Sequence, residues 1–219
     1  MMNRRDWMRF IAVGGAAAAS MRIAQALAKG DFPPGIHQLD CTASVNGRPA
    51  HAGTPVNLGD RVTTGRLSQT VIVVGSDAFL VRAKSTIEVK GSDGVLKELL
   101  VASGQVLSVF SKKPVVIKAA NASIGIRGTG AYIEINPDSV YFCLCYGEAL
   151  VEGPGMPKGK LVKTTHHEQP LLLNDEGGVM RVEPGPFLNH SDAELVMLEA
   201  LVGREPPFVR DGTYPAKRY

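Results

Sequence analysis

Short runs of β-branched and apolar residues, each ended by Gly, Asn, Asp or Pro, fill residues 41–182 and constrain the fold more than any other feature. Strands of four to seven residues at such regular spacing are typical of an all-β protein. No helical pattern between them could form the crossover of a parallel α/β sheet. We therefore predict strands at residues 69–74, 78–81, 86–89, 97–101, 105–110, 115–119, 122–126, 131–135, 140–146 and 148–151.

Glycine-containing turns separate these strands and indicate that neighbours pair in an antiparallel way. The clearest turns lie at residues 75–77, 91–94, 102–104 and 136–138. A strand, a turn and a returning strand recur roughly every 15 to 20 residues, which is close to the period of stacked units. This spacing favours a β-roll or solenoid-like stack of short antiparallel strands over a closed barrel.

One helix is predicted after the β region, within residues 185–219. Ser191 is placed as its N-cap and Glu194 as its third residue, which together form a capping box. Gly203 is placed at its C-terminal end, and residues 204–219 are expected to form an extended tail. The apolar face predicts docking on the protein's own sheet, with a partner-binding helix as the alternative. This face contains Leu195, Leu198, Leu201 and Val202.

The amino terminus resembles a twin-arginine export signal over residues 1–28. Arg4 and Arg5 precede an apolar stretch at residues 10–21, and residues 24–28 offer small-x-small cleavage sites. We expect a linker at residues 29–40 and a periplasmic location for the rest, with an uncleaved membrane anchor as the alternative. Because the twin-arginine route carries folded proteins, the leader also indicates a site that is filled before export.

Charge gives no reason to expect a nucleic-acid partner. The chain carries 24 Lys and Arg against 21 Asp and Glu, but four of the arginines belong to the leader. The remainder is close to neutral and has no basic cluster with interleaved aromatic residues.

Residues 45–151, which are most of a β domain predicted at residues 41–184, resemble the FecR domain, a family named for a regulator of iron-dicitrate transport. The resemblance is carried by the order of the turn motifs Gly59-Asp60, Thr64-Gly65 and Gly128-Thr129, with Ser85 between the second and third. It implies an all-β, extracytoplasmic, non-enzymatic domain that binds or senses a partner, here a periplasmic or envelope protein. The best-known members also have a cytoplasmic anti-sigma domain. No segment of this chain resembles that domain, so we expect a stand-alone exported module.

Two cysteines and two histidines form the one constellation that predicts chemistry. Cys143 and Cys145 are two residues apart in a predicted strand, so both thiols project from one face. His166 and His167 follow about twenty residues later, and a returning strand could bring one imidazole beside the thiols. Such a Cys2His or Cys2His2 set suits zinc, copper or iron. The typical FecR pattern lacks this set, which makes a periplasmic metal-binding or redox protein the alternative function.

Two further ligands and two non-metal explanations remain open. Cys41 and His190 could complete the metal site. Alternatively, the cysteines are buried as small apolar residues, or one of them is bonded to Cys41. A Cys145–His167 nucleophile pair is weaker, because no orienting acid or oxyanion site accompanies it. The glycine-rich stretch at residues 125–130 lacks the helix that a phosphate loop requires, so we expect no enzyme.

Overall fold

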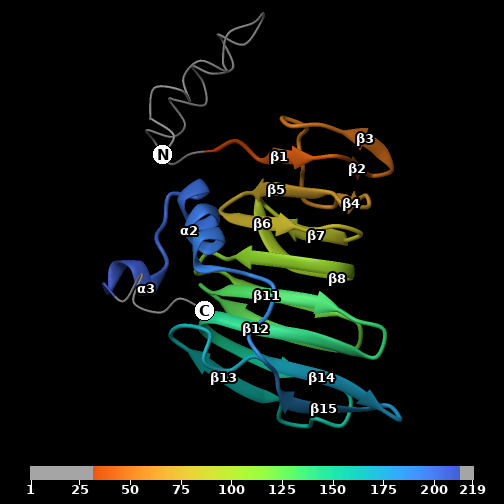
Figure 1. Ribbon diagram of the computed structural model, residues 1–219, viewed down its shortest axis with the longest axis vertical. Helices are drawn as coiled ribbons and strands as arrows, with labels where there is room; N and C mark the ends of the chain where they lie inside the picture. Colours follow the sequence, from red (N-terminus) through yellow and green to blue (C-terminus); the bar gives the residue numbers. More distant parts are fainter. Residues whose placement is uncertain (1–31, 213–219) are drawn as a thin grey trace, which may run out of the picture.

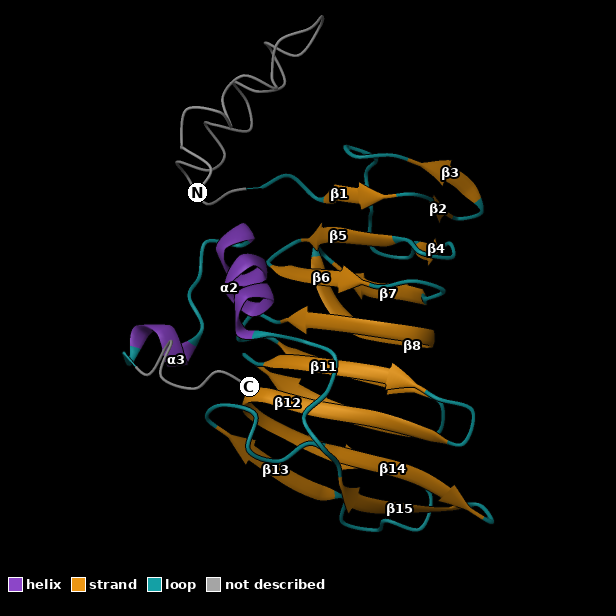
Figure 2. Ribbon diagram, in the orientation of Figure 1, coloured by secondary structure: helices purple, strands orange, loops and turns teal. Residues whose placement is uncertain are grey.

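The computed structural model describes residues 32–212, and this part of the chain is mostly β (Figures 1 and 2). Two helices, α2 (Asp192–Leu201) and α3 (Pro207–Arg210), follow the strands and lie on one side of them. The prediction of an all-β chain with a C-terminal helix is therefore confirmed. The strands are β1 (Gly35–Asp40), β2 (Ala43–Val45), β3 (Arg48–Ala50), β4 (Arg61–Thr64), β5 (Gln69–Val74), β6 (Asp77–Val81), β7 (Thr86–Ser92), β8 (Val95–Val109), β9 (Pro114–Ala119), β10 (Ala122–Arg127), β11 (Gly130–Ile135), β12 (Ser139–Glu152), β13 (Lys160–Thr164), β14 (Leu171–Glu176) and β15 (Val179–Pro184).

The strands form two sheets that share their two longest members, β8 and β12. Sheet A contains β1, β5, β6, β11, β14 and β15, and sheet B contains β2, β3, β4, β7, β9, β10 and β13. Hydrogen bonds join β8 to β11, β11 to β12, β12 to β10, β10 to β9 and β9 back to β8. These five strands close into a barrel, from which the others extend. The preference for an open stack over a closed barrel was therefore wrong.

Two pairs of predicted short strands are each one long, bent strand. β8 includes most of predicted strands 97–101 and 105–110, and β12 includes 140–146 and 148–151. Gly104 and Gly147, which lie where these strands pass from one sheet to the other, have φ angles of 81° and 99°. Glycine adopts such angles without steric cost. A glycine that predicts a turn between two strands therefore bends a single strand here.

One strand pair departs from the antiparallel pattern among the described strands. β9 runs parallel to the first half of β8. Between them the chain passes through sheet A, as the second half of β8, and then returns to sheet B. A strand and two bends thus replace the helical crossover that usually joins parallel neighbours. This single coil is the part of the fold that resembles the predicted solenoid.

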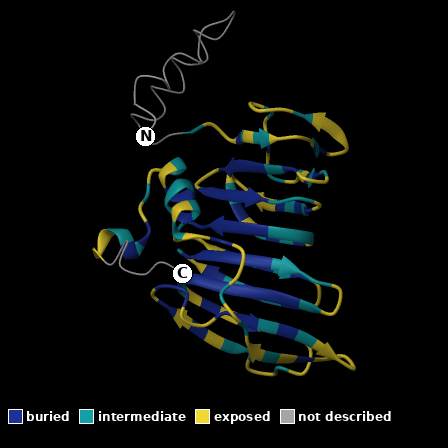
Figure 3. Ribbon diagram, viewed as in Figure 1, coloured by how far each residue is buried: buried dark blue, intermediate teal, exposed yellow. Residues whose placement is uncertain are grey.

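Two hydrophobic cores lie on opposite faces of sheet A. The inner core fills the space between the sheets, and its residues come from alternate positions of nearly every strand. The outer core lies between sheet A and the helices, where Leu195 and Leu198 of α2 and Phe208 of α3 are buried. Burial is continuous over residues 106–109 of β8, 130–133 of β11 and 140–146 of β12, and Figure 3 shows long dark-blue stretches on these strands. A sheet buried on both faces explains why its strands read as unbroken apolar runs.

Two boundaries differ from those predicted. Gly35–Asp40 is strand β1, paired with β5, although the segment was predicted as part of a linker. The expected tail contains α3, whose Phe208 is 2% exposed, so burial of one aromatic ring organises this segment.

The capping box of α2 is confirmed, because the Glu194 carboxylate accepts the Ser191 backbone N–H at 2.9 Å. The predicted leader lies outside the described residues, and within residues 32–212 no helix is long and apolar enough to span a membrane.

The residues that carry the FecR resemblance connect neighbouring strands. The Asp60 carboxylate accepts the side-chain N–H of Asn46 at 2.7 Å, and the Thr64 hydroxyl accepts the backbone N–H of Ser85 at 3.0 Å. Gly65 leaves no room for a side chain, because its Cβ would lie 2.1 Å from the hydroxyl oxygen of Thr42. Gly59 and Gly128 have positive φ angles, and Thr129 is fully buried. In this chain these residues therefore have structural roles.

Candidate metal centre

Cys143 and Cys145 lie in the outer core, beneath the C-terminal segment. Along β12, Phe142 and Leu144 point into the inner core, and the two cysteines between and beside them point outward. Both cysteines are 0% exposed. The prediction that the two thiols share one face of a strand is therefore confirmed.

His167 reaches the thiols from the loop that follows β13. Its φ angle of 58° is in the left-handed region, and its backbone N–H donates to the Cys145 carbonyl at 3.0 Å. The Glu168 carboxylate stabilises this loop by accepting the backbone N–H groups of Thr165 and His166 at 2.8 and 2.9 Å. Burial opposes ionisation of Glu168, but the hydrogen bonds from Thr165 and His166 outweigh it and lower its pKa to about 2. The loop therefore holds His167 against the thiols through backbone contacts.

His190 reaches the same point from the connection between β15 and α2. Its ring stacks on the Tyr132 ring, with centroids 4.6 Å apart and planes 16° apart. Phe187 contacts both this imidazole and that of His167, with centroid distances of 4.6 and 4.7 Å. These aromatic rings limit the approach of water to the imidazoles, and an apolar shell of this kind controls solvent access to a metal site.

Four donor atoms converge in what we call the four-ligand group, which consists of Cys143, Cys145, His167 and His190. The Sγ of Cys143 lies 3.6 Å from Nδ1 of His167, and the Sγ of Cys145 lies 3.5 Å from Nε2 of His190. The two imidazole nitrogens are 3.2 Å apart. Tetrahedral zinc, with bonds of about 2.3 Å to sulfur and 2.0–2.1 Å to nitrogen, requires separations of about 3.6 Å (S–N) and 3.4 Å (N–N). The three observed separations, 3.6, 3.5 and 3.2 Å, are close to these values.

The other nitrogen of each imidazole has an acceptor. Nδ1–H of His190 donates to the Leu188 carbonyl at 2.6 Å, and Nε2–H of His167 donates to the Asp192 carboxylate at 3.1 Å. The same carboxylate oxygen accepts Nε2–H of His166 at 2.8 Å. Such outer acceptors set the tautomer of a metal-binding histidine and make its inward nitrogen more basic.

The two thiols differ in their readiness to ionise. A hydrogen bond from Cys145 is the largest cause that lowers the pKa of Cys143, to about 4, and His167 and His190 act in the same direction. Burial raises the pKa of Cys145 well above its ordinary value. Cys143 is therefore the thiol that ionises more readily to the thiolate form that binds metals, whereas Cys145 would release its proton when a metal binds.

The structure brings together three of the four predicted ligands and exchanges the fourth. Cys143, Cys145 and His167 meet as predicted, but His190 completes the group in place of His166. His166 instead joins His167 and Asp192 in a second, adjacent group. The side chains of His166 and His167 leave this bent loop in different directions, so only His167 faces the thiols.

Cys41 lies outside the site, although the sequence offered it as a ligand, and Asp192 belongs to the site, although the sequence did not predict it. Cys41 is exposed and belongs to neither group, and all three cysteines are free thiols, so the structure contains no Cys41 disulfide. Asp192 was missed as an outer partner of the imidazoles. The only signal for it was an acidic residue in the first turn of α2, which the helix dipole alone explains.

Cys143, His167 and Asp192 also lie in the order of a Cys-His-Asp triad. Asp192 is the orienting acid of this triad, and the sequence did not reveal it. The distances are 3.6 Å from sulfur to imidazole and 3.1 Å from imidazole to carboxylate. A nucleophile, however, must be accessible to a substrate. Cys143 and the His167 side chain are both 0% exposed, so the arrangement suits a closed metal site better than a nucleophile.

The comparisons with known proteins give no family for the chain. No protein-family model matches it, and no curated protein matches it either. Two crystal structures of a "putative anti-sigma factor" from Parabacteroides distasonis ATCC 8503 are similar at 8% identity, each with a TM-score of 0.47. The first match covers 57% of this chain and 59% of that one, and the second covers 63% and 71%. This chain thus spans less than two thirds of the first structure, and a likeness of this size identifies neither family nor function.

Proposed function

We propose that the protein is an exported, non-catalytic binding or sensing module that holds one zinc ion at Cys143, Cys145, His167 and His190. The proposal has two parts, a metal centre and a partner-binding role. The metal centre is supported by the geometry of the four-ligand group. The partner-binding role is supported by the leader and by the FecR resemblance.

The observation that carries the metal centre is the pair of imidazole nitrogens that face each other at 3.2 Å. The hydrogen bonds to Leu188 and Asp192 use the outer nitrogens of His190 and His167, so their inner nitrogens face each other beside the Cys143 sulfur. Three donor atoms at such distances are held together by a cation between them, either a proton or a metal ion. The fourth donor, at tetrahedral spacing, favours the metal.

Zinc is favoured because the site is closed. Structural zinc sites use four protein ligands from cysteine and histidine, whereas catalytic sites keep one position open for water or substrate. All four residues here are buried, the most exposed being His190 at 7%. The metal would connect strand β12, the loop after β13 and the segment before α2. It would therefore fix the C-terminal segment to the barrel.

The second candidate function is a copper- or iron-dependent redox protein at the same four residues. The enclosure of the imidazoles by Tyr132 and Phe187 favours it, because a dry, apolar shell controls the potential of a redox metal. Visible absorption separates the two candidates. Zinc is colourless, whereas copper(II) or iron(III) bound to thiolate absorbs in the visible range, so the spectrum is recorded after mild oxidation.

Elemental analysis of protein exported with its own leader tests the metal centre. We expect one zinc per chain in the natural sequence and none in the double variant Cys143→Ser, Cys145→Ser. Cys41→Ser is the matched control, since it removes an exposed thiol outside the site and should retain the metal. A protein that contains no metal and binds none when zinc is added would overturn the proposal. So would loss of the metal in the control.

Cell fractionation and crosslinking test the partner-binding role separately. We expect the mature protein in the periplasm, crosslinked to a periplasmic or envelope protein. Substitution of Arg4 and Arg5 by lysine should retain it in the cytoplasm. Export that continues without the two arginines would contradict the assignment of the leader.

A further inference from the structure

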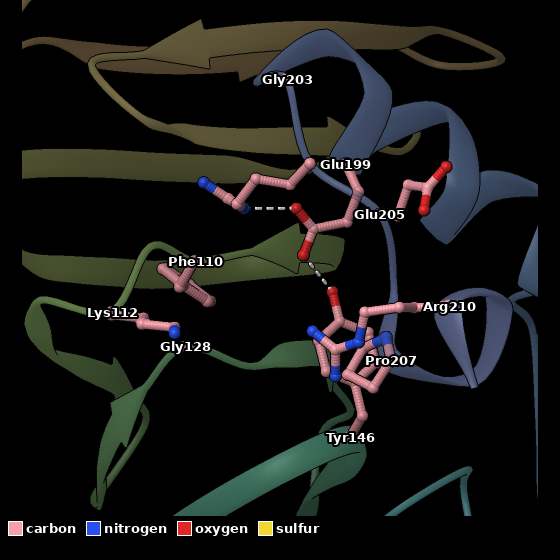
Figure 4. A pocket seen from close by; sticks show the side chains of 10 residues that line it. Phe110, Lys112, Gly128, Tyr146, Glu199, Gly203, Glu205, Pro207 and Arg210 are labelled. Atoms are coloured by element: carbon pink, nitrogen blue, oxygen red, sulfur yellow. Dashed lines mark hydrogen bonds and ion pairs between the residues drawn. The ribbon is translucent and has the colours of Figure 1, made fainter.

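The two sheets differ in what covers their outer faces. The helices cover the outer face of sheet A, where the Glu199 carboxylate of α2 accepts the Tyr146 hydroxyl of β12 (Figure 4). On the outer face of sheet B, by contrast, Leu150 of β12 and Leu161 of β13 are 37% and 56% exposed. Sheet B therefore presents apolar side chains to solvent.

These leucines belong to a row of residues that crosses four neighbouring strands. The ladder pairs Leu161 with Leu150, Leu150 with Gly125 of β10, and Gly125 with Val116 of β9. Residues directly opposite each other in antiparallel strands lie on one face of the sheet. The apolar sequence neighbours of these four residues belong to the inner core, so the row itself faces outward. We call these four residues the outer row.

Gly125 makes a hollow in the outer row. A Cβ placed there would lie 4.0 Å from the Leu150 carbonyl oxygen and would otherwise be in open space. A hollow of about 520 Å³ lies over this part of the sheet and is lined by β9, β10, β12 and β13. The row thus presents an exposed leucine beside a space that the leucine of another molecule can fill.

Charged residues flank the outer row on β10 and β12. Two residues along the strands from Gly125 and Leu150 come Arg127 and Glu148, which are exposed and also line the hollow. In the other direction along β12, Glu152 is exposed as well. The charge pattern is therefore not the same on the two sides of the row, and it can fix the orientation of a partner.

Of the two-fold axes that lie along or across the strands, one matches both the shape and the charge of this surface. An axis parallel to the strands, between β10 and β12, places each β10 residue opposite its β12 neighbour in a second copy. Leu150 then faces Gly125, and Glu148 faces Arg127. An axis across the strands at the row would place Leu150 against Leu150 and Glu148 against Glu152, which are like charges.

We propose that the protein associates with a second copy of itself through the outer face of sheet B. Leu150 of each copy fills the hollow at Gly125 of the other, and Glu148 of each copy pairs with Arg127 of the other. Four strands at a spacing of about 4.8 Å span only about 14 Å. The contact is therefore smaller than the standard of about 800 Å² per partner, and we expect a weak dimer with a Kd of about 100 μM.

Sedimentation equilibrium of the exported protein, at concentrations up to about ten times this Kd, tests the association. Leu161→Ser should raise Kd at least about tenfold, because it removes an exposed apolar contact twice in each dimer. Gly125→Thr should do the same by filling the hollow. Leu67→Ser is the matched control, since Leu67 is 87% exposed in the turn between β4 and β5, outside the outer row.

Charge reversal tests the arrangement of the two copies. Arg127→Glu and Glu148→Arg should each raise Kd about tenfold, because each places like charges opposite each other. The double variant reverses both charges and should restore Kd to within about threefold of the natural value. Circular dichroism of each variant separates loss of association from loss of folding.

Three results would overturn the proposal: a protein that stays monomeric at the highest concentration, an equal loss of association in Leu67→Ser, and a double variant as weak as the single ones. Crosslinking from position 161 that captures a different protein, and no second copy, would assign the surface to that partner instead. The outer row contains none of the four metal ligands, so its failure and the failure of the metal centre are separate results.

Discussion

Substitution of Asp192 by Asn tests whether the outer carboxylate tunes the metal centre. Asp192 is 12% exposed in its side chain and accepts hydrogen bonds from two imidazoles, those of His167 and His166. Asparagine preserves the shape and one acceptor oxygen but removes the negative charge. Loss of such an outer partner lowers metal affinity by a factor of about 10–100, which corresponds to about 1.4–2.7 kcal/mol at 25 °C.

Competition for zinc against a chromophoric chelator measures this change directly. Glu194→Gln is the matched control, because it removes the same charge from the same helical turn. The Glu194 carboxylate contacts Arg82 and Ser191 but neither imidazole. We expect its zinc affinity to stay within about twofold of the natural protein, since Glu194 contacts no metal ligand and a helix-end charge typically affects stability by less than about 1 kcal/mol.

Two outcomes would refute the reasoning. If Asp192→Asn binds zinc as tightly as the natural protein, the carboxylate does not support the ligands. If Glu194→Gln weakens zinc to the same degree, the effect of Asp192 is on helix docking and not on the imidazoles. Thermal unfolding of both variants without metal separates these causes.

Three further predictions concern stability. Removal of zinc by a chelator should lower the Tm measured by calorimetry. At a free zinc concentration 100 times Kd, the bound ion stabilises the folded state by about 2.7 kcal/mol. An unchanged Tm would contradict a bound ion. Gly104→Ala should lower the free energy of unfolding, measured by urea titration, by about 3 kcal/mol. The φ of Gly104 is positive, and a Cβ there would lie 2.5 Å from the Cα of Ser85. The control Gly177→Ala, also at positive φ but in open space, should lower it by about 1 kcal/mol. Burial raises the pKa of Asp77 in the folded protein, although the hydrogen bond from the Ser111 backbone N–H opposes this shift. The protonated form therefore contributes stability that is complete below the unfolded pKa of about 4. This stability is lost as pH rises through the folded pKa. Asp77→Asn should therefore raise stability at neutral pH and flatten the pH dependence above about pH 4 in denaturant titrations; an unchanged slope would contradict this.

The fold class was predictable because it depends on local signals. Apolar runs, whether alternating or continuous, and the turn residues that end them mark each strand, whichever strand it pairs with. Ring closure was not predictable, because it depends on which strands lie side by side after the chain has folded. Gly104 and Gly147 show the difficulty: each marks a positive φ, but a turn and a bend both use that angle.

The part of the candidate site that could be predicted is the pair of cysteines, because their two-residue spacing in a strand determines their common face. Cys143 and Cys145 share a face because residues two apart in a strand always do. The choice between His166 and His167 depends on the φ of 58° at His167, which is held by a hydrogen bond to Cys145. His190 and Asp192 enter through the docking of α2 on sheet A, a tertiary contact that no local pattern announces.

The connection of three chain segments at the four-ligand group also has a consequence for the unfolded chain. All three cysteines are free, so no covalent crosslink restricts that ensemble. An ion that stayed attached on unfolding would close one loop of 24 residues, from Cys143 to His167, and another of 23 residues, from His167 to His190. By analogy with disulfides, each closure lowers chain entropy by an amount worth about 3 kcal/mol. The metal would then act as a reversible crosslink in a protein that has no permanent one.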